Sequence, residues 1–166
     1  NRRKWVCDSS EQWQFSQQQK QSLVLGIIDI DYFKKYNDRY GHQQGDIALR
    51  RIANAVRRLL YKNKGDLYRC GGEEFYFYIA VNDNDNIVNL LEQCLDSVFD
   101  LEISHKGSLV SPFISISIGA IQVIPHDDIN VECVMKHADD NLYKVKNSTR
   151  NAVNFTEAND QNKLIC

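Results

Sequence analysis

The chain has 166 residues, of which 43% are hydrophobic and 25% are charged, and this composition is typical of one globular domain with a sizeable core. Its formal net charge of −2 provides no strong basic field, so we expect no nucleic-acid partner. No apolar run reaches the roughly 18 residues that a membrane-spanning helix requires, so we expect no membrane contact by this domain.

Five cysteines are scattered along the chain, and none belongs to a Cys-x-x-Cys pair. Their odd number and spacing argue against a disulfide framework and a zinc site, and are typical of a reducing compartment. No signal peptide is visible, so we expect a cytoplasmic domain. Because the first residue is Asn1 rather than methionine, we also expect a fragment of a longer protein, whose other segments can anchor it to a membrane.

The first predicted strand follows a polar segment. Residues 1–21 place a few apolar side chains so that one helical face can be apolar, and residues 16–22 indicate a loop. Residues 23–31 form a near-continuous apolar run, which is typical of a strand buried on both faces. The run ends in Asp29 and Asp31, which share one face if the strand persists that far, because strand side chains alternate.

Two helices are predicted next. Residues 32–40 indicate a short helix that Gly41 stops, and Gly45-Asp46 opens a longer amphipathic helix, with Asp46 as a reasonable N-cap. The arginines of the longer helix lie mostly away from its apolar face and indicate a solvated surface. The apolar residues repeat at about 3.6 positions and are Ile47, Leu49, Ile52, Ala53, Val56, Leu59 and Leu60.

A β-hairpin is predicted over residues 66–81, because Gly71-Gly72 separates two runs rich in apolar and aromatic residues. Glu73 and Glu74 follow the glycines and lead straight into the second run, so at least one carboxylate lies near the buried end of a strand. Two like charges held together are costly unless a cation or a proton offsets them. The alternative interpretation is a solvated hairpin tip whose glutamates serve solubility.

The rest of the chain completes an α+β pattern. In order, we expect a turn at 82–86, a helix at 87–99, a strand at 113–120, a helix at 131–145, a strand at 152–155 and a frayed tail at 157–166. The resulting order is β-α-α-β-β-α-β-α-β. It predicts a central, mostly antiparallel five-stranded sheet flanked by helices, close to a ferredoxin-like arrangement.

A metal site is predicted where two of these strands meet. Asp29 ends one buried strand and Glu73 precedes another, so the carboxylates meet at one edge of the sheet if the strands pair centrally. Oxygen ligands without His or Cys favour Mg²⁺ or Mn²⁺ over zinc, and the backbone carbonyl of Ile30 can add a further oxygen. Carboxylates that hold divalent ions beside lysines are typical of active sites for phosphoryl or nucleotidyl transfer.

Three basic residues are candidates for phosphate binding. Lys34 begins the short helix, where its ammonium and the free N–H groups can hold phosphates, although an ordinary exposed lysine also fits. Lys146 and Arg150 lie four residues apart at a helix C-terminus. They either clamp phosphates or interact favourably with the helix dipole.

Asn37, His42 and Asp46 can together recognise a purine. A carboxylate suits guanine because it accepts from the N1–H and amino groups, and the asparagine amide can contact the other edge. Each residue also has an ordinary interpretation, as a turn former, a loop residue and a helix cap respectively.

These motifs together resemble a known family. Residues 29–46 contain D-I-D-x-F-K-x-x-N-D-x-x-G-H-x-x-G-D, and residues 69–75 contain R-x-G-G-E-E-F. Residues 115–119 contain S-x-S-x-G, and residues 138–151 contain A-D-x-x-L-Y-x-x-K-x-x-x-R-N. This pattern closely resembles the GGDEF domain of diguanylate cyclases, in its GGEEF variant. The resemblance covers residues 1–156 and implies a GGDEF catalytic domain clipped at its N-terminus.

The resemblance implies a palm-like fold, similar to nucleotidyl cyclase catalytic domains, and a specific reaction. The family condenses two GTP into cyclic di-GMP and two pyrophosphates with Mg²⁺ or Mn²⁺, across a homodimer controlled by an upstream sensory or dimerisation domain. The implied roles are metal binding by Asp29, Glu73 and the Ile30 carbonyl, base catalysis by Glu73 with support from Glu74, transition-state stabilisation by Lys34, guanine binding by Asn37, His42 and Asp46, and phosphate binding by Lys146 and Arg150.

Departures from the family pattern concern regulation and loops. Many members carry an Arg-x-x-Asp product-inhibition motif before the glycine pair, and residues 62–66 contain none, so we expect no feedback through that site. Thr149 stands where the family usually has glycine, a change that can alter the loop before Arg150. Tyr32 replaces a common Phe or His, and for this change we expect no consequence. A non-catalytic domain that binds GTP or cyclic di-GMP is the alternative, but the retained glycines and carboxylates favour an active cyclase. A cyclase for other nucleotides is a third possibility, against which Asp46 argues.

Overall fold

The computed structural model describes residues 1–82, 85–158 and 164, and it confirms the predicted order of elements with one helix in front. The elements are α1 (Arg2–Gln19), β1 (Leu23–Ile30), α2 (Phe33–Tyr40), α3 (His42–Lys62), β2 (Gly65–Gly71), β3 (Glu74–Ala80), α4 (Ile87–Phe99), β4 (Ile116–Val123), α5 (Val131–Lys146) and β5 (Val153–Glu157).

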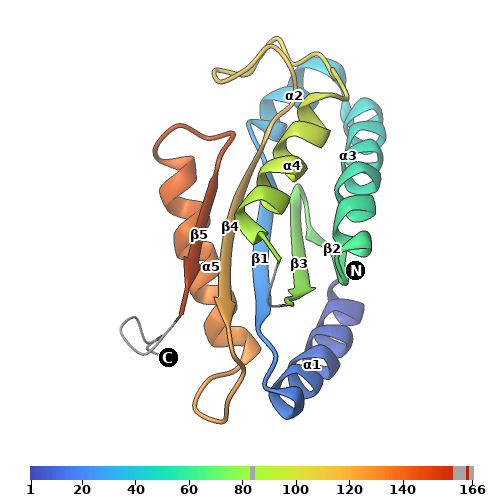
Figure 1. The fold of residues 1–166 in the computed structure, drawn as a ribbon. Coiled ribbons are helices and arrows are strands. Elements are labelled where there is room, and N and C mark those ends of the chain that lie inside the picture. The colour runs from blue at the N-terminus through green and yellow to red at the C-terminus, as the bar shows by residue number, and fades with distance from the viewer. Residues whose placement is uncertain (83–84, 159–163, 165–166) are drawn as a thin grey trace.

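The five strands form one sheet in the order β2-β3-β1-β4-β5 (Figure 1). The pairs β2–β3, β3–β1 and β1–β4 are antiparallel, and β4–β5 is parallel. All eight residues of β1 are buried, because this central strand has a neighbour on each side and helices over both faces. The predicted α+β class with a mostly antiparallel five-stranded sheet is therefore confirmed.

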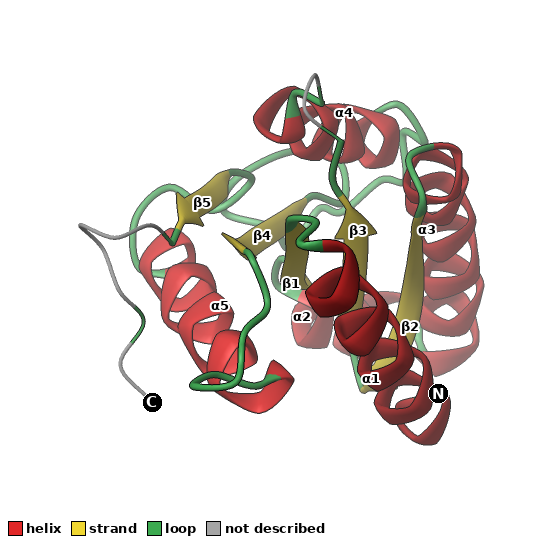
Figure 2. Ribbon diagram, turned by 60° about the horizontal axis from the view of Figure 1, so that its bottom comes forward, coloured by secondary structure: helices red, strands yellow, loops and turns green. Residues whose placement is uncertain are grey.

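Each face of the sheet has its own hydrophobic core. Figure 2 shows α3 and α4 on one face and α1 and α5 on the other. Alternate residues of β1 enter different cores: Val24 and Ile28 pack with the α3 and α4 residues, whereas Leu25 and Ile27 pack with those of α1 and α5. By this alternation the side chain of Asp29 lies on the α5 face.

Two helix boundaries differ from the prediction. Helix α1 continues through the polar residues 16–19, because Ser16 is fully buried and its small side chain lets the helix pack closely. Helix α3 begins at His42 rather than at Asp46, so Asp46 lies within the helix and is not its N-cap. Gly41 takes that position with φ of 83°, which lets the chain turn sharply between α2 and α3.

The second half of the chain follows the prediction more closely. Strand β4 begins at Ile116 rather than at residue 113, since Phe113 forms only an isolated bridge with Ser104. Of the turn predicted at 82–86, residues 83–84 lie outside the described part, and Asn86 caps α4. Strand β5 extends to Glu157, and the N–H of Ala158 donates to the Gln122 carbonyl at 2.8 Å. Residues 159–163 and 165–166 of the tail predicted to fray lie outside the description.

Two further findings concern the cysteines and the membrane. Cys7, Cys70 and Cys94 are free, but Cys133 is disulfide-bonded, which the cysteine pattern did not predict. Scattered spacing could not indicate a bond that depends on the fold. Within the described residues, no helix has both the length and the apolar character needed to cross a membrane.

Candidate active site

The candidate site lies at the end of β1 that leads into α2, beside the β2–β3 turn (Figure 1). Asp29 is in register with Glu74 on β3 and with Ser117 on β4. The turn that precedes β3 contains Gly72, whose φ of 41° is one that L side chains rarely adopt. The antiparallel pairing of β1 with β3 therefore brings Asp29 and the Glu73–Glu74 pair to one edge of the sheet, as the sequence predicted.

Asp29 is a buried carboxylate with one cationic partner. Its side chain is 6% exposed, and Lys146 Nζ lies 2.9 Å from Oδ2. Burial, with smaller contributions from the charges of Glu73 and Glu74, raises the pKa of Asp29 to about 6, although Lys146 opposes the rise. The ionised form of Asp29 is therefore held by Lys146 alone among the described side chains, and a second cation at this position would stabilise it.

Asp31, immediately after β1, is fully buried and has several partners. The hydroxyls of Ser115 and Ser117 donate to its carboxylate at 2.7 Å each, and the backbone N–H of Asn151 donates at 3.0 Å. Arg150 Nη1 lies 3.6 Å from Oδ1. Asp29 and Asp31 both meet a basic residue from the end of α5 or the loop after it, which agrees with a shared face. Protein donors therefore occupy the Asp31 carboxylate, whereas Lys146 is the described side-chain partner of Asp29.

The predicted guanine-binding residues surround the corner between α2 and α3. His42 and Asp46 are exposed one turn apart on α3, so they face the same side. Asn37 is half-buried, and its Oδ1 has no hydrogen-bond partner. A Cβ at Gly45 would collide with this amide, so the glycine permits its close approach to α3. A buried carbonyl oxygen without a donor is the acceptor that an amino group would satisfy.

The basic residues divide into one free and two engaged side chains. Lys34 is exposed at the start of α2. Lys146, the last residue of α5, pairs with Asp29, and Arg150 lies over the ring of Tyr32 at 4.4 Å while facing Asp31. The left-handed residues of this loop are Arg150 and Asn151, not Thr149, so the missing glycine at 149 imposes no strain. The closest partners of Lys146 and Arg150 are thus carboxylates rather than the end of α5 alone.

Two residues at the site were not indicated by the sequence. Tyr32, expected to be without consequence, lies under Arg150 and has a left-handed φ of 55°. His105 comes from the irregular segment before β4, is buried, and contacts the carbonyl of Tyr32 through Nε2 at 3.1 Å. Burial lowers the pKa of His105. The unusual residue at position 32 was the one available signal, and His105 belongs to no motif.

The donor set fits a divalent ion held by few protein ligands. The described residues contain no group of three or more His, Cys, Asp or Glu side chains placed to hold a metal. The predicted set is smaller, with two carboxylates, Asp29 and Glu73, and the Ile30 carbonyl. Such a partial oxygen set suits Mg²⁺ or Mn²⁺, which retain waters and take further ligands from substrate phosphates.

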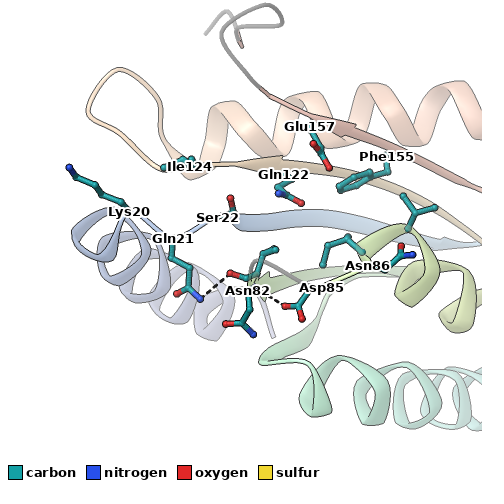
Figure 3. Close-up of a pocket in the computed structure, with 13 residues that line it drawn as sticks. Lys20, Gln21, Ser22, Asn82, Asp85, Asn86, Gln122, Ile124, Phe155 and Glu157 are labelled. Carbon is teal, nitrogen blue, oxygen red and sulfur yellow. Dashed lines mark hydrogen bonds between the residues drawn. The ribbon is translucent and has the colours of Figure 1, made fainter.

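A cavity of about 610 Å³ lies at the opposite end of the sheet, near the start of β1, and none of the predicted site residues lines it (Figure 3). Several of its polar groups already have protein partners. Gln21 Nε2 donates to the Val81 carbonyl at 3.1 Å, and Asp85 Oδ2 accepts from the Asn82 N–H at 2.7 Å. This cavity is therefore separate from the candidate active site.

The chain is similar to several known proteins. A family model described as "Diguanylate cyclase, GGDEF domain" matches residues 1–152. Diguanylate cyclase A of Treponema denticola is 31% identical over 144 residues, 87% of this chain and 38% of that relative. An uncharacterized membrane protein of Staphylococcus saprophyticus is 35% identical over 146 residues, 88% of this chain and 40% of the relative. The structure of the active GGEEF domain of a diguanylate cyclase from Vibrio cholerae matches with a TM-score of 0.77 and 27% identity, covering 93% of this chain and 96% of that one.

The fold is an α+β domain with a five-stranded mixed sheet, as in solved GGDEF domains. With a family model matching nearly the whole chain, the protein belongs to the GGDEF family. The chain spans about 40% of the length of the curated relatives that it matches.

Proposed function

We propose that this domain is a diguanylate cyclase, which condenses two GTP into cyclic di-GMP and two pyrophosphates. The observation that carries the proposal is the buried carboxylate of Asp29, held by one lysine at the edge where Glu73 and Glu74 lie. Family membership supports it, as do the relative named diguanylate cyclase A and the structural neighbour described as an active GGEEF domain.

In this proposal Asp29, Glu73 and the Ile30 carbonyl hold Mg²⁺ or Mn²⁺. When bound, a divalent ion supplies the charge that activates the attacking 3′-hydroxyl and neutralises the leaving pyrophosphate. Lys146 and Arg150 would bind the distal phosphates, and a divalent ion at Asp29 would replace Lys146 as the cation beside that carboxylate. Lys34, exposed at the start of α2, approaches the charge that develops on the α-phosphate.

Glu73 takes the proton of the 3′-hydroxyl, and Glu74 supports it electrostatically. The two residues differ in surroundings, since Glu73 is half-buried and Glu74 is exposed.

Asn37, His42 and Asp46 bind guanine. The unpaired Oδ1 of Asn37 accepts from the base, while the Asp46 carboxylate accepts from its N1–H and amino group. Adenine presents an acceptor at N1 and would face this carboxylate unfavourably, so the corner between α2 and α3 selects guanine.

The proposed catalytic unit comprises residues 1–156 in a homodimer, because each bound GTP supplies the hydroxyl that attacks the α-phosphate of the other. An upstream sensory or dimerisation domain would bring two such domains together in a longer protein. A cytoplasmic domain anchored by other segments agrees with the longer staphylococcal relative described as a membrane protein.

The test is incubation of the purified domain at high concentration with GTP and Mg²⁺ or Mn²⁺, followed by chromatography for cyclic di-GMP and pyrophosphate. We expect product from the native chain. The variant Glu73→Gln should lose turnover while GTP binding largely survives, because it retains shape but not charge. Unchanged product formation in that variant would contradict the assignment of Glu73. Absence of both product and GTP binding in the native chain would favour a non-catalytic regulatory domain.

A further inference from the structure

Tyr32 occupies an unusual position at the turn between β1 and α2. It is a non-glycine residue with φ of 55°, a conformation that L side chains adopt only when their surroundings compensate. Its carbonyl meets two donors, the N–H of Tyr36 at 3.1 Å and His105 Nε2 at 3.1 Å. The 1% exposure of His105 shows that this contact is protected from water. The backbone of Tyr32 is therefore held from α2 and from the segment before β4.

The ring of Tyr32 supports the guanidinium of Arg150, whose centre lies 4.4 Å from the ring centroid. On another side, Arg150 Nη1 lies 3.6 Å from the carboxylate of Asp31. The backbone of Arg150 is fixed as well, since its N–H donates to the Val145 carbonyl at 3.1 Å. A side chain with many rotamers is thus confined between a ring and a buried carboxylate, and its backbone is fixed to the end of α5.

Asp31 is itself immobile, because two serine hydroxyls and the Asn151 N–H bind its carboxylate in the core. A guanidinium carries five N–H donors in a rigid fork, and in Arg150 it is Nη1 that faces the Asp31 carboxylate at 3.6 Å. The remaining donors keep the planar geometry that suits phosphate oxygens.

We propose that Tyr32 is a positioning residue that holds Arg150 ready for the distal phosphates of the bound nucleotide. The proposal rests on the proposed function, because it takes GTP as the ligand of this site. Binding a nucleotide requires that the phosphate-binding side chains lose rotamer freedom, and a side chain that is already confined loses less. The ring of Tyr32 provides this confinement without removing charge from Arg150.

The test is a double-mutant cycle on nucleotide affinity. The native chain, Tyr32→Leu, Arg150→Ala and the combined variant are titrated by calorimetry with Mg²⁺ and the α,β-methylene analogue of GTP, which cannot undergo the reaction. We expect Tyr32→Leu to weaken binding roughly two- to tenfold, as immobilising one rotamer-rich side chain would. In the Arg150→Ala background the same change should have no further effect, since Tyr32 acts through Arg150.

Two control variants separate positioning from general stability. Tyr32→Phe keeps the ring and should bind the analogue like the native chain. Lys144→Ala removes a neighbouring exposed charge of α5 and should also leave affinity unchanged. If the Tyr32→Leu loss is equally large with and without Arg150, or if there is no loss, the inference is wrong. If the native chain does not bind the analogue at all, the proposed function fails and the inference fails with it.

Discussion

The two aspartates at the end of β1 lie in contrasting surroundings. Asp31 receives three hydrogen bonds from protein groups and faces Arg150, so its buried charge is satisfied within the fold. Asp29 is also buried, but Lys146 is its one described hydrogen-bonding partner, and its pKa is raised to about 6. Because both aspartates are buried but only one has a full set of protein partners, burial alone does not identify a functional carboxylate. The carboxylate without a full set of fixed partners is the one that can exchange one cation for another.

The largest expected effect comes from removing the satisfied carboxylate. Asp31→Ala leaves Arg150, two serine hydroxyls and a backbone N–H without their shared acceptor, and breaking such a buried pair costs about 3–5 kcal/mol of unfolding free energy. At about pH 4, where burial keeps Asp29 largely protonated in the folded chain, Asp29→Asn should change stability by less than about 1 kcal/mol, because asparagine replaces a neutral side chain and Lys146 is partly exposed. Urea denaturation of both variants measures the difference. Equal destabilisation would remove the contrast between the two sites.

The pH dependence of stability should reveal the second effect. The pKa of Asp29 in the folded chain, about 6, lies above the ordinary value of 3.8 that applies to the unfolded chain, so the unfolded chain releases this proton first as pH rises. Protonated Asp29 contributes fully to the unfolding free energy below about pH 4, and this contribution is lost as the pH rises through about 6. The loss is about 3 kcal/mol at most, from 1.36 kcal/mol per pKa unit.

The measurement is the unfolding free energy of the native chain minus that of Asp29→Asn, at pH 4 and at pH 7, without divalent ions. Asn cannot titrate, so this difference isolates Asp29 from the other acids. We expect the native chain to lose stability relative to the variant between the two pH values. A difference independent of pH would show that Asp29 has an ordinary acidity.

The smallest effect concerns the competition of cations at Asp29. Lys146→Met removes the ammonium that neutralises this carboxylate. Mn²⁺ should then bind roughly tenfold more tightly in the absence of nucleotide, because the repulsion between the ammonium and Mn²⁺ at a few ångströms in a half-buried site exceeds about 1 kcal/mol. Electron paramagnetic resonance at pH 8.5 measures free Mn²⁺ while keeping Asp29 ionised. Lys144→Met, on the exposed side of α5, is the matched control. Weaker Mn²⁺ binding in Lys146→Met alone would refute the competition.

Much of the site could be predicted because it depends on local patterns. The Gly-Gly pair indicated the hairpin, and the apolar run of β1 indicated a central strand, which together placed Asp29 near Glu73 and Glu74. The start of α3 was not predicted correctly, because aspartate is a residue type that often caps helices and Asp46 was assigned that role. The N-cap is in fact Gly41, whose φ of 83° allows the turn between α2 and α3. The glutamine-rich end of α1 was assigned to a loop because the burial of Ser16 is not a local property.

The order of elements, the pairing of strands around the hairpin and the family membership could be predicted from the sequence. These follow from periodicity, turn chemistry and motif spacing, which are properties of neighbouring residues. The long-range packing set which aspartate is satisfied, which cation each one meets, and that the Tyr32 ring lies under Arg150 while His105 contacts the Tyr32 carbonyl. The physical reason is that burial and charge pairing are set by segments distant in the chain, since β1, the start of β4 and the loop after α5 converge at one end of the sheet.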